Sequence, residues 1–105
     1  MLPRIEQLFA EVMAAEGYEG WTLRWLEHDA YCWIDQKRID LCPMDSEAEC
    51  AQMLLHEVAH ISTAAGHRNK HHPGFFARLE ELTQKYLGVG LSQYQLEMKQ
   101  IYCPD

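Results

Sequence analysis

The sequence lacks any long hydrophobic run. Hydrophobic residues make up 48% of its 105 residues, but no apolar stretch approaches the roughly 20 residues of a transmembrane helix. Residues 1–6 carry acidic and basic side chains and lack the hydrophobic segment of a secretory signal, so we expect a cytoplasmic protein that makes no membrane contact. Length and composition predict one globular domain over residues 1–105.

Basic residues are also few. Nine Lys and Arg stand against 16 Asp and Glu, which gives a net charge of −7 with histidine neutral. Nucleic acids and anionic lipids attract proteins through Lys and Arg, so this balance predicts neither as a partner. Arg68 and Lys70 could still form a local basic patch.

Closely spaced cysteine pairs are absent. The four cysteines, Cys32, Cys42, Cys50 and Cys103, include no CxxC pair. Zinc ribbons are built from such pairs, so we expect no second, structural metal. Without a secretory signal the thiols are expected to be reduced, and Cys32 and Cys50 to pack as small apolar residues.

Hydrophobic periodicity predicts an α+β fold. Apolar residues at three- and four-residue steps predict a helix over residues 3–15. Alternation predicts strands over 21–25, 31–35 and 38–42, arranged as a small three-stranded antiparallel meander. The three tryptophans are expected in the core or on a sheet face, at Trp21, Trp25 and Trp33.

Three further helices are predicted after the strands. Ser46 and Glu49 have the spacing of a capping box, so a helix should begin there and end near residue 64. A polar loop then leads to a helix over about 73–86, and Ser92 caps a last helix, followed by a frayed tail at 103–105. On one side of that last helix lie Leu96 and Ile101.

The segment His56-Glu57-Val58-Ala59-His60 carries the most specific chemistry. Residues four apart on a helix share a face, so His56 and His60 can bind one zinc ion with Glu57 beside it as a base. The competing interpretation is a helix with two solvated histidines, which the apolar residues at 51–55 disfavour.

A catalytic zinc needs a third protein ligand and one open position for water. His71 and His72 can both be presented by the loop that enters the helix at residue 73. His67 follows His60 closely, and Glu97 would give a site with two histidines and one glutamate, without a supporting local pattern. We expect His28 and His67 to be exposed polar residues.

These features together resemble a SprT-like zinc metallopeptidase domain over most of the chain. The resemblance rests on the predicted helix and sheet, the HExxH helix, and His71-His72-Pro73-Gly74-Phe75-Phe76. In that family a loop histidine four positions before an aromatic supplies the third ligand, which favours His71, four before Phe75, although His72 stands in the same relation to Phe76. Many relatives carry a C-terminal zinc ribbon, and this chain stops at Asp105 without one.

The resemblance implies a zincin-like fold and a zinc peptidase acting on a peptide or protein substrate. His56, His60 and His71 would bind Zn²⁺, and Glu57 would act as the general base. An extended substrate could pair with an exposed edge of the sheet. The side chains considered as donors to the oxyanion are Tyr86, Tyr94, His67 and His72.

Two alternatives remain open at this point. One is a latent or non-catalytic zinc-binding module that acts through a protein partner, with the last helix covering the cleft. The other is a protease that cleaves a single regulator or antitoxin. Neither the substrate nor the oligomeric state follows from the sequence.

Overall fold

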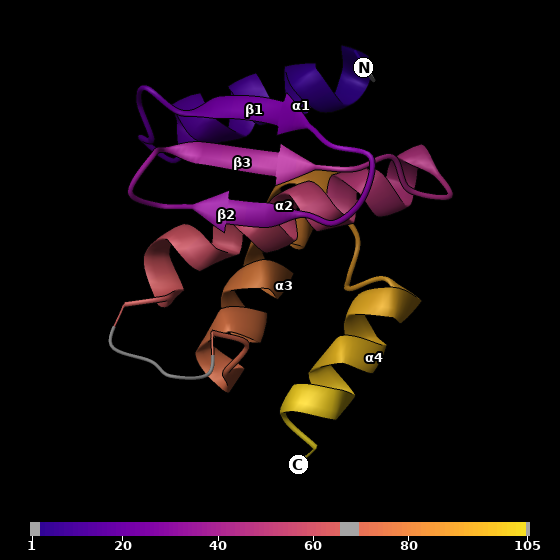
Figure 1. Cartoon of the computed structure of the whole chain (residues 1–105). Helices are drawn as coiled ribbons and strands as arrows, with labels where there is room; N and C mark the ends of the chain where they lie inside the picture. The colour runs from indigo at the N-terminus through magenta and orange to yellow at the C-terminus, as the bar shows by residue number, and fades with distance from the viewer. Residues whose placement is uncertain (1–2, 66–69, 105) are drawn as a thin grey trace.

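The computed structural model describes residues 3–65 and 70–104, which form four helices and a three-stranded sheet (Figure 1). The elements are α1 (Pro3–Ala15), β1 (Thr22–Trp25), β2 (Tyr31–Trp33), β3 (Arg38–Leu41), α2 (Glu47–Thr63), α3 (Pro73–Leu87) and α4 (Gln93–Tyr102). The predicted α+β class is confirmed, and the predicted ends agree to within about two residues. No helix in these two ranges has the length and apolar character needed to cross a membrane.

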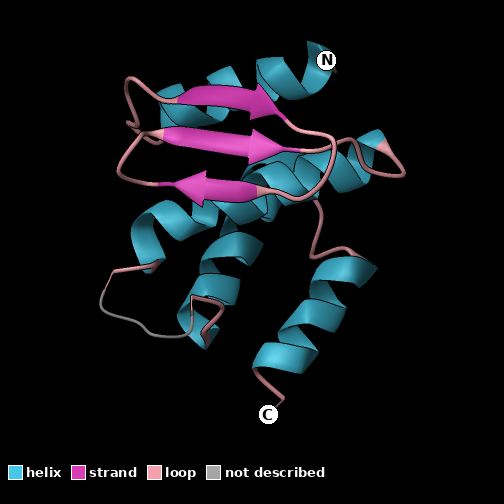
Figure 2. Ribbon diagram, in the orientation of Figure 1, coloured by secondary structure: helices cyan, strands magenta, loops and turns pink. Residues whose placement is uncertain are grey.

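The sheet is mixed, so the prediction of an antiparallel meander was wrong. Its strand order is β1-β3-β2: β3 pairs antiparallel with β2 but parallel with β1 (Figure 2). The predicted reversal at 35–37 does join β2 to β3. Residues 26–30 instead connect β1 to β2 across the position of β3, so that β1 and β2 are not neighbours. Ile39 and Leu41 of β3 are fully buried. Because β3 is the central strand, both of its edges are paired with a neighbouring strand.

The inner face of the sheet packs on α2. Leu23, Trp25 and Cys32 lie on this face and join the core that α2 shares with α1, α3 and the sheet. Helix α2 is buried continuously from Cys50 to Ala59, because neighbouring elements cover it on several sides. The segment His56–His60 therefore lies on the most enclosed helix of the fold.

The outer face of the sheet carries a buried carboxylate, Asp40, that links β3 to both β1 and β2. Asp40 accepts bonds from Arg24 at 2.9 and 3.0 Å, from Arg38 at 3.1 Å and from Trp33 Nε1 at 2.7 Å. Burial alone would raise the pKa of Asp40, but these donors outweigh it and hold the pKa below its ordinary value. Trp33 is thus a sheet-face residue, as predicted.

The ends of α2 and α4 are joined through Glu49. Ser46 Oγ accepts from Glu49 N at 3.0 Å, which is the N-cap bond that the capping box predicts. The Glu49 carboxylate accepts from Ser92 Oγ at 3.0 Å, and Ser92 is itself the N-cap of α4. The start of α4 is therefore held against the start of α2.

The Glu16 side chain links the end of α1 to α3 by hydrogen bonds and ion pairs. Its carboxylate accepts from Arg78 at 2.6 Å, from Lys85 at 2.9 Å and from the Tyr86 hydroxyl. The hydrogen bond from Tyr86, followed by those from Arg78 and Lys85, lowers the pKa of Glu16 to about 2. Tyr86 is therefore engaged in helix packing.

Helix α4 does not pack on the core through Leu96 and Ile101. Leu96 and Ile101 are 46% and 74% exposed, and Gln95 is the only buried residue of the helix. Leu91, Met98 and Cys103 contact the core instead. Cys103 was expected in a frayed tail, but its thiol donates to the carbonyl of His71 at 3.4 Å.

Candidate metal centre

Helix α2 presents His56 and His60 on one face. The two imidazole rings lie one helical turn apart, with centroids separated by 5.1 Å. His56 is 3% exposed, and Glu57 between them is 4% exposed. This spacing is the part of the site that the helix itself dictates.

The loop before α3 brings His71 to the same point. His71 Nε2 lies 3.1 Å from His56 Nε2, and one ligand atom from each of the three histidines lies within 4.8 Å of the others. Two ligands of a tetrahedral zinc at about 2.0–2.1 Å are about 3.3 Å apart, so the His56–His71 separation fits a shared metal.

His72 points elsewhere, because it is the N-cap of α3. Its backbone is extended, as expected before Pro73, and neighbouring side chains of an extended segment point in opposite directions. The ring accepts from Phe75 N at 3.3 Å through Nδ1 and lies 2.8 Å from the Thr63 carbonyl through Nε2, which requires Nε2 to carry the proton. A Cβ at Gly74 would come within 2.9 Å of the His72 ring, so glycine permits this arrangement.

Gln95 of α4 contacts the candidate ligand His56. Gln95 Oε1 lies 2.8 Å from His56 Nδ1, and the glutamine is fully buried. An amide oxygen at this place accepts the Nδ1 proton, which leaves the Nε2 lone pair of His56 directed at His71. Metal-binding histidines in proteins usually have such an acceptor on the second nitrogen.

Aromatic rings hold the other two imidazoles. Phe75 stacks on His60 with centroids 4.4 Å apart, and Tyr102 stacks on His71 at 4.5 Å, each at an interplanar angle of 24°. These contacts restrict the rotation of both rings, so less conformational entropy remains to be lost when the site takes up a ligand.

Burial keeps the three imidazoles neutral at pH 7. Burial lowers the pKa of His56 to about 4, although the hydrogen bond that His56 donates to Gln95 opposes this, and it lowers the pKa of His60 to about 3, with a further contribution from the neighbouring His56. Burial also lowers the pKa of His71. Neutral imidazole is the form that binds metal, and three such donors suit Zn²⁺ among other transition-metal ions.

Glu57 lies in the same enclosed region. Burial, followed by the charge of Asp40, raises the pKa of the Glu57 carboxyl to about 8. A cation at the histidines would oppose both effects and favour the carboxylate. Burial and the neighbouring Glu57 raise the pKa of Cys32 to about 12, so this thiol is no nucleophile, consistent with its predicted packing role.

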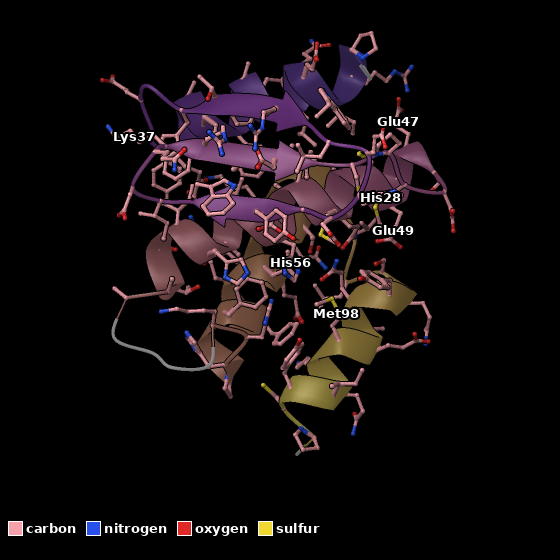
Figure 3. All side chains as sticks on the ribbon, viewed as in Figure 1. His28, Lys37, Glu47, Glu49, His56 and Met98 are labelled. Atoms are coloured by element: carbon pink, nitrogen blue, oxygen red, sulfur yellow. The ribbon has the colours of Figure 1, made fainter. Side chains whose placement is uncertain are left out.

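A cleft of about 870 Å³ opens onto the three histidines and Glu57. Its walls are residues 29–36 around β2, part of α2, the segment with Lys70 and His71, and Tyr94 and Met98 of α4. Figure 3 shows His56 below β2 and Met98 on the facing side of α4. The strand β2 is an edge strand of the sheet, so one wall of the cleft offers backbone groups.

The described candidates Glu97 and His28 do not line this cleft. Glu97 is exposed on α4 and accepts from Gln93, and His28 is exposed as predicted. Of the suggested oxyanion donors, Tyr94 lines the cleft, while Tyr86 bonds Glu16. His67 lies outside the described residues, and so does Arg68, one of the two residues of the suggested basic patch.

Sequence reasoning missed Gln95 and Tyr102. A signal was present: Leu91, Gln95, Met98 and Tyr102 follow one another at helical steps of four, three and four residues. Gln95 occupies an interior position of that stripe, where an apolar residue is usual. A buried glutamine in such a stripe indicates a specific hydrogen-bond partner, here His56.

Comparisons of the chain with protein-family models, with curated proteins and with solved structures found no match.

Proposed function

We propose that this protein is a zinc-dependent peptidase with a SprT-like, zincin-type catalytic domain. The observation that supports this most directly is the meeting of His56, His60 and His71 in one cleft with Glu57. A purely structural metal site has no need of a buried glutamate beside two of its ligands, and a solvated pair of histidines would not be enclosed by three other elements.

The residues have separate roles in this proposal. His56, His60 and His71 would hold the metal, and a bound zinc would supply a Lewis acid that activates water and polarises the scissile carbonyl. Glu57 accepts the proton of the attacking water and delivers it to the leaving amine. Tyr94, exposed at the cleft, is the donor that we assign to the developing oxyanion.

The proposed substrate is an extended segment of a peptide or protein. Within the described residues β2 pairs only with β3, so its other edge is free to bond a substrate backbone. The residues of β2 line the cleft together with Glu57, so a peptide added to this edge passes the proposed catalytic groups. Backbone pairing gives affinity without demanding one particular sequence.

Replacing Glu57 with Gln tests the proposal. Glu57→Gln should keep about one zinc per chain and lose roughly 10²- to 10⁴-fold in hydrolysis of an unfolded protein substrate, because only the base is removed. Glu47→Gln is the matched control, since Glu47 lies on the same helix but is exposed. Metal content and hydrolysis are measured on the same samples.

Three results would contradict the proposal. A zinc content near zero that His56→Ala leaves unchanged would exclude the proposed metal site. Loss of zinc in Glu57→Gln would make Glu57 a structural residue. Hydrolysis that survives in Glu57→Gln would exclude it as the base.

A non-catalytic zinc-binding module is the second candidate. Helix α4 favours it, because Tyr94 and Met98 narrow the cleft and Tyr102 lies on the ring of His71. This candidate would be favoured if the wild type binds zinc fully but hydrolyses no unfolded protein. Hydrolysis should then remain absent when the α4 side chains at the cleft are removed.

A further inference from the structure

Three contacts attach helix α4 and its C-cap to two of the candidate metal ligands. Gln95 contacts the His56 ring, Tyr102 stacks on the His71 ring, and the Cys103 thiol donates to the His71 carbonyl. Among the described residues, its other hydrogen bonds to the rest of the molecule lie at its start, where Ser92 bonds Glu49 and Gln52. In Figure 1 the helix stands apart from the others, and its outer side is exposed.

The interior contact of α4 is chemically unusual, because it is a fully buried amide. Gln95 is the only buried residue of the helix, and its Nε2 has no hydrogen-bond partner within residues 3–65 and 70–104. Burying an unsatisfied donor disfavours the docked position of α4. The bond between Gln95 Oε1 and His56 Nδ1 helps to offset that cost, together with the packing of Leu91, Met98 and Cys103 on the core, so its strength affects how firmly α4 docks.

That bond becomes stronger when His56 carries a cation. An imidazole with a positive charge at Nε2 is a better donor from Nδ1, and charge-assisted hydrogen bonds are about twice as strong as neutral ones. In the other direction, the Gln95 oxygen fixes the proton on Nδ1 and so keeps Nε2 free for the metal. Two equilibria that share one bond are coupled equally in both directions.

We propose that Gln95 couples metal binding to the docking of α4, so that the metal completes the α4 wall of the cleft. The metal and the docked helix stabilise each other through the Gln95–His56 hydrogen bond. The coupling rests on the proposed metal site and makes Gln95 a positioning residue. As a consequence, Tyr94 and Met98, which line the cleft from α4, are held in position only when the metal is bound.

Hydrogen exchange of the wild-type chain with and without Zn²⁺ tests the coupling without any variant. Zinc should slow amide exchange throughout α4 as well as around the histidines. Zinc affinity, measured by competition with a chelating dye, should fall about 10- to 100-fold in Gln95→Met, which keeps the side-chain length but has no acceptor. Gln95→Glu keeps an acceptor oxygen and should bind zinc at least as tightly as the wild type.

Gln100→Met provides the matched control. Gln100 is exposed on the same helix, and its side chain bonds the Pro104 carbonyl and no other described residue, so the zinc affinity and α4 exchange of this variant should equal those of the wild type. In Gln95→Met, zinc should still slow exchange near the histidines but no longer in α4. A long-range ¹H–¹⁵N spectrum should show the His56 proton on Nδ1 in the zinc-bound wild type.

The outcomes separate this inference from the metal site itself. If zinc binds with dependence on His56 but leaves α4 exchange unchanged, or if Gln95→Met binds zinc as the wild type does, the coupling is overturned and the site stands. Equal loss of affinity in Gln95→Met and Gln95→Glu would also overturn it, because the acceptor would then be irrelevant. Zinc binding that is absent, or indifferent to His56→Ala, overturns both.

Discussion

Replacing His71 and His72 separately by alanine should produce opposite phenotypes, although the two residues are adjacent and chemically identical. His71 Nε2 faces His56 Nε2 at 3.1 Å, whereas His72 caps α3 and contacts the Thr63 carbonyl at 2.8 Å. His71→Ala should therefore lose zinc and destabilise the metal-free protein less than His72→Ala does, because the His71 ring is held by stacking on Tyr102 and not by a cap. His72→Ala should destabilise the metal-free protein and retain zinc.

The magnitudes follow from the contacts. Structural zinc sites with four ligands are worth about 10–16 kcal/mol, so removing one of three nitrogen ligands should cost on the order of 4 kcal/mol, about a thousandfold in affinity. Losing the His72 cap costs about 1 kcal/mol and losing its bond to Thr63 about 1 kcal/mol more. The sum of about 2 kcal/mol corresponds to a fall of roughly 10 °C in the unfolding midpoint of a domain this size.

Two measurements on each variant are sufficient. Chelator competition gives the zinc affinity, and thermal unfolding in excess chelator gives the stability of the metal-free protein. Phe75 and Pro73 are unchanged in both variants, so the start of α3 differs only at the replaced residue. If His72→Ala loses zinc and His71→Ala does not, the assignment of the third ligand is off by one residue and the geometric argument fails.

Two further predictions concern charge. Glu16, with its pKa lowered to about 2 from 4.5, stabilises the fold fully above about pH 4.5 and loses that contribution as the pH falls toward 2. Glu16→Gln should thus lower the free energy of unfolding by about 1–2 kcal/mol at pH 7, allowing for solvent screening, and by much less at pH 2. Urea denaturation of variant and wild type over a pH series measures this difference. A difference that stays the same at every pH would refute this account. With a net charge of −7, and with Lys70 Nζ bonded to the Ala64 carbonyl at 2.7 Å, the protein should not bind DNA at physiological salt. Single-stranded DNA should leave its hydrolysis unchanged, and a several-fold, salt-sensitive stimulation would show that the charge argument is wrong.

The sequence by itself determined the elements and the central pair of histidines. Helix and strand periods are local properties, so the ranges of α1, α2 and α3 follow from the spacing of apolar residues and from caps such as Ser46 and Gly88. The relation between His56 and His60 is local as well, because one turn of helix sets it. The choice of His71 came from a family resemblance, and it remains a prediction as a metal ligand.

Only the tertiary structure decided which elements lie side by side. Alternation along a strand selects a face but names no neighbour, so it could not reveal that β3 lies between β1 and β2. The directions of His71 and His72 depend on the extended backbone before Pro73 and on contacts to α2. The role of Gln95 depends on a partner 39 residues away, which no local pattern encodes, because the hydrogen bond to His56 exists only once α4 has folded back onto α2.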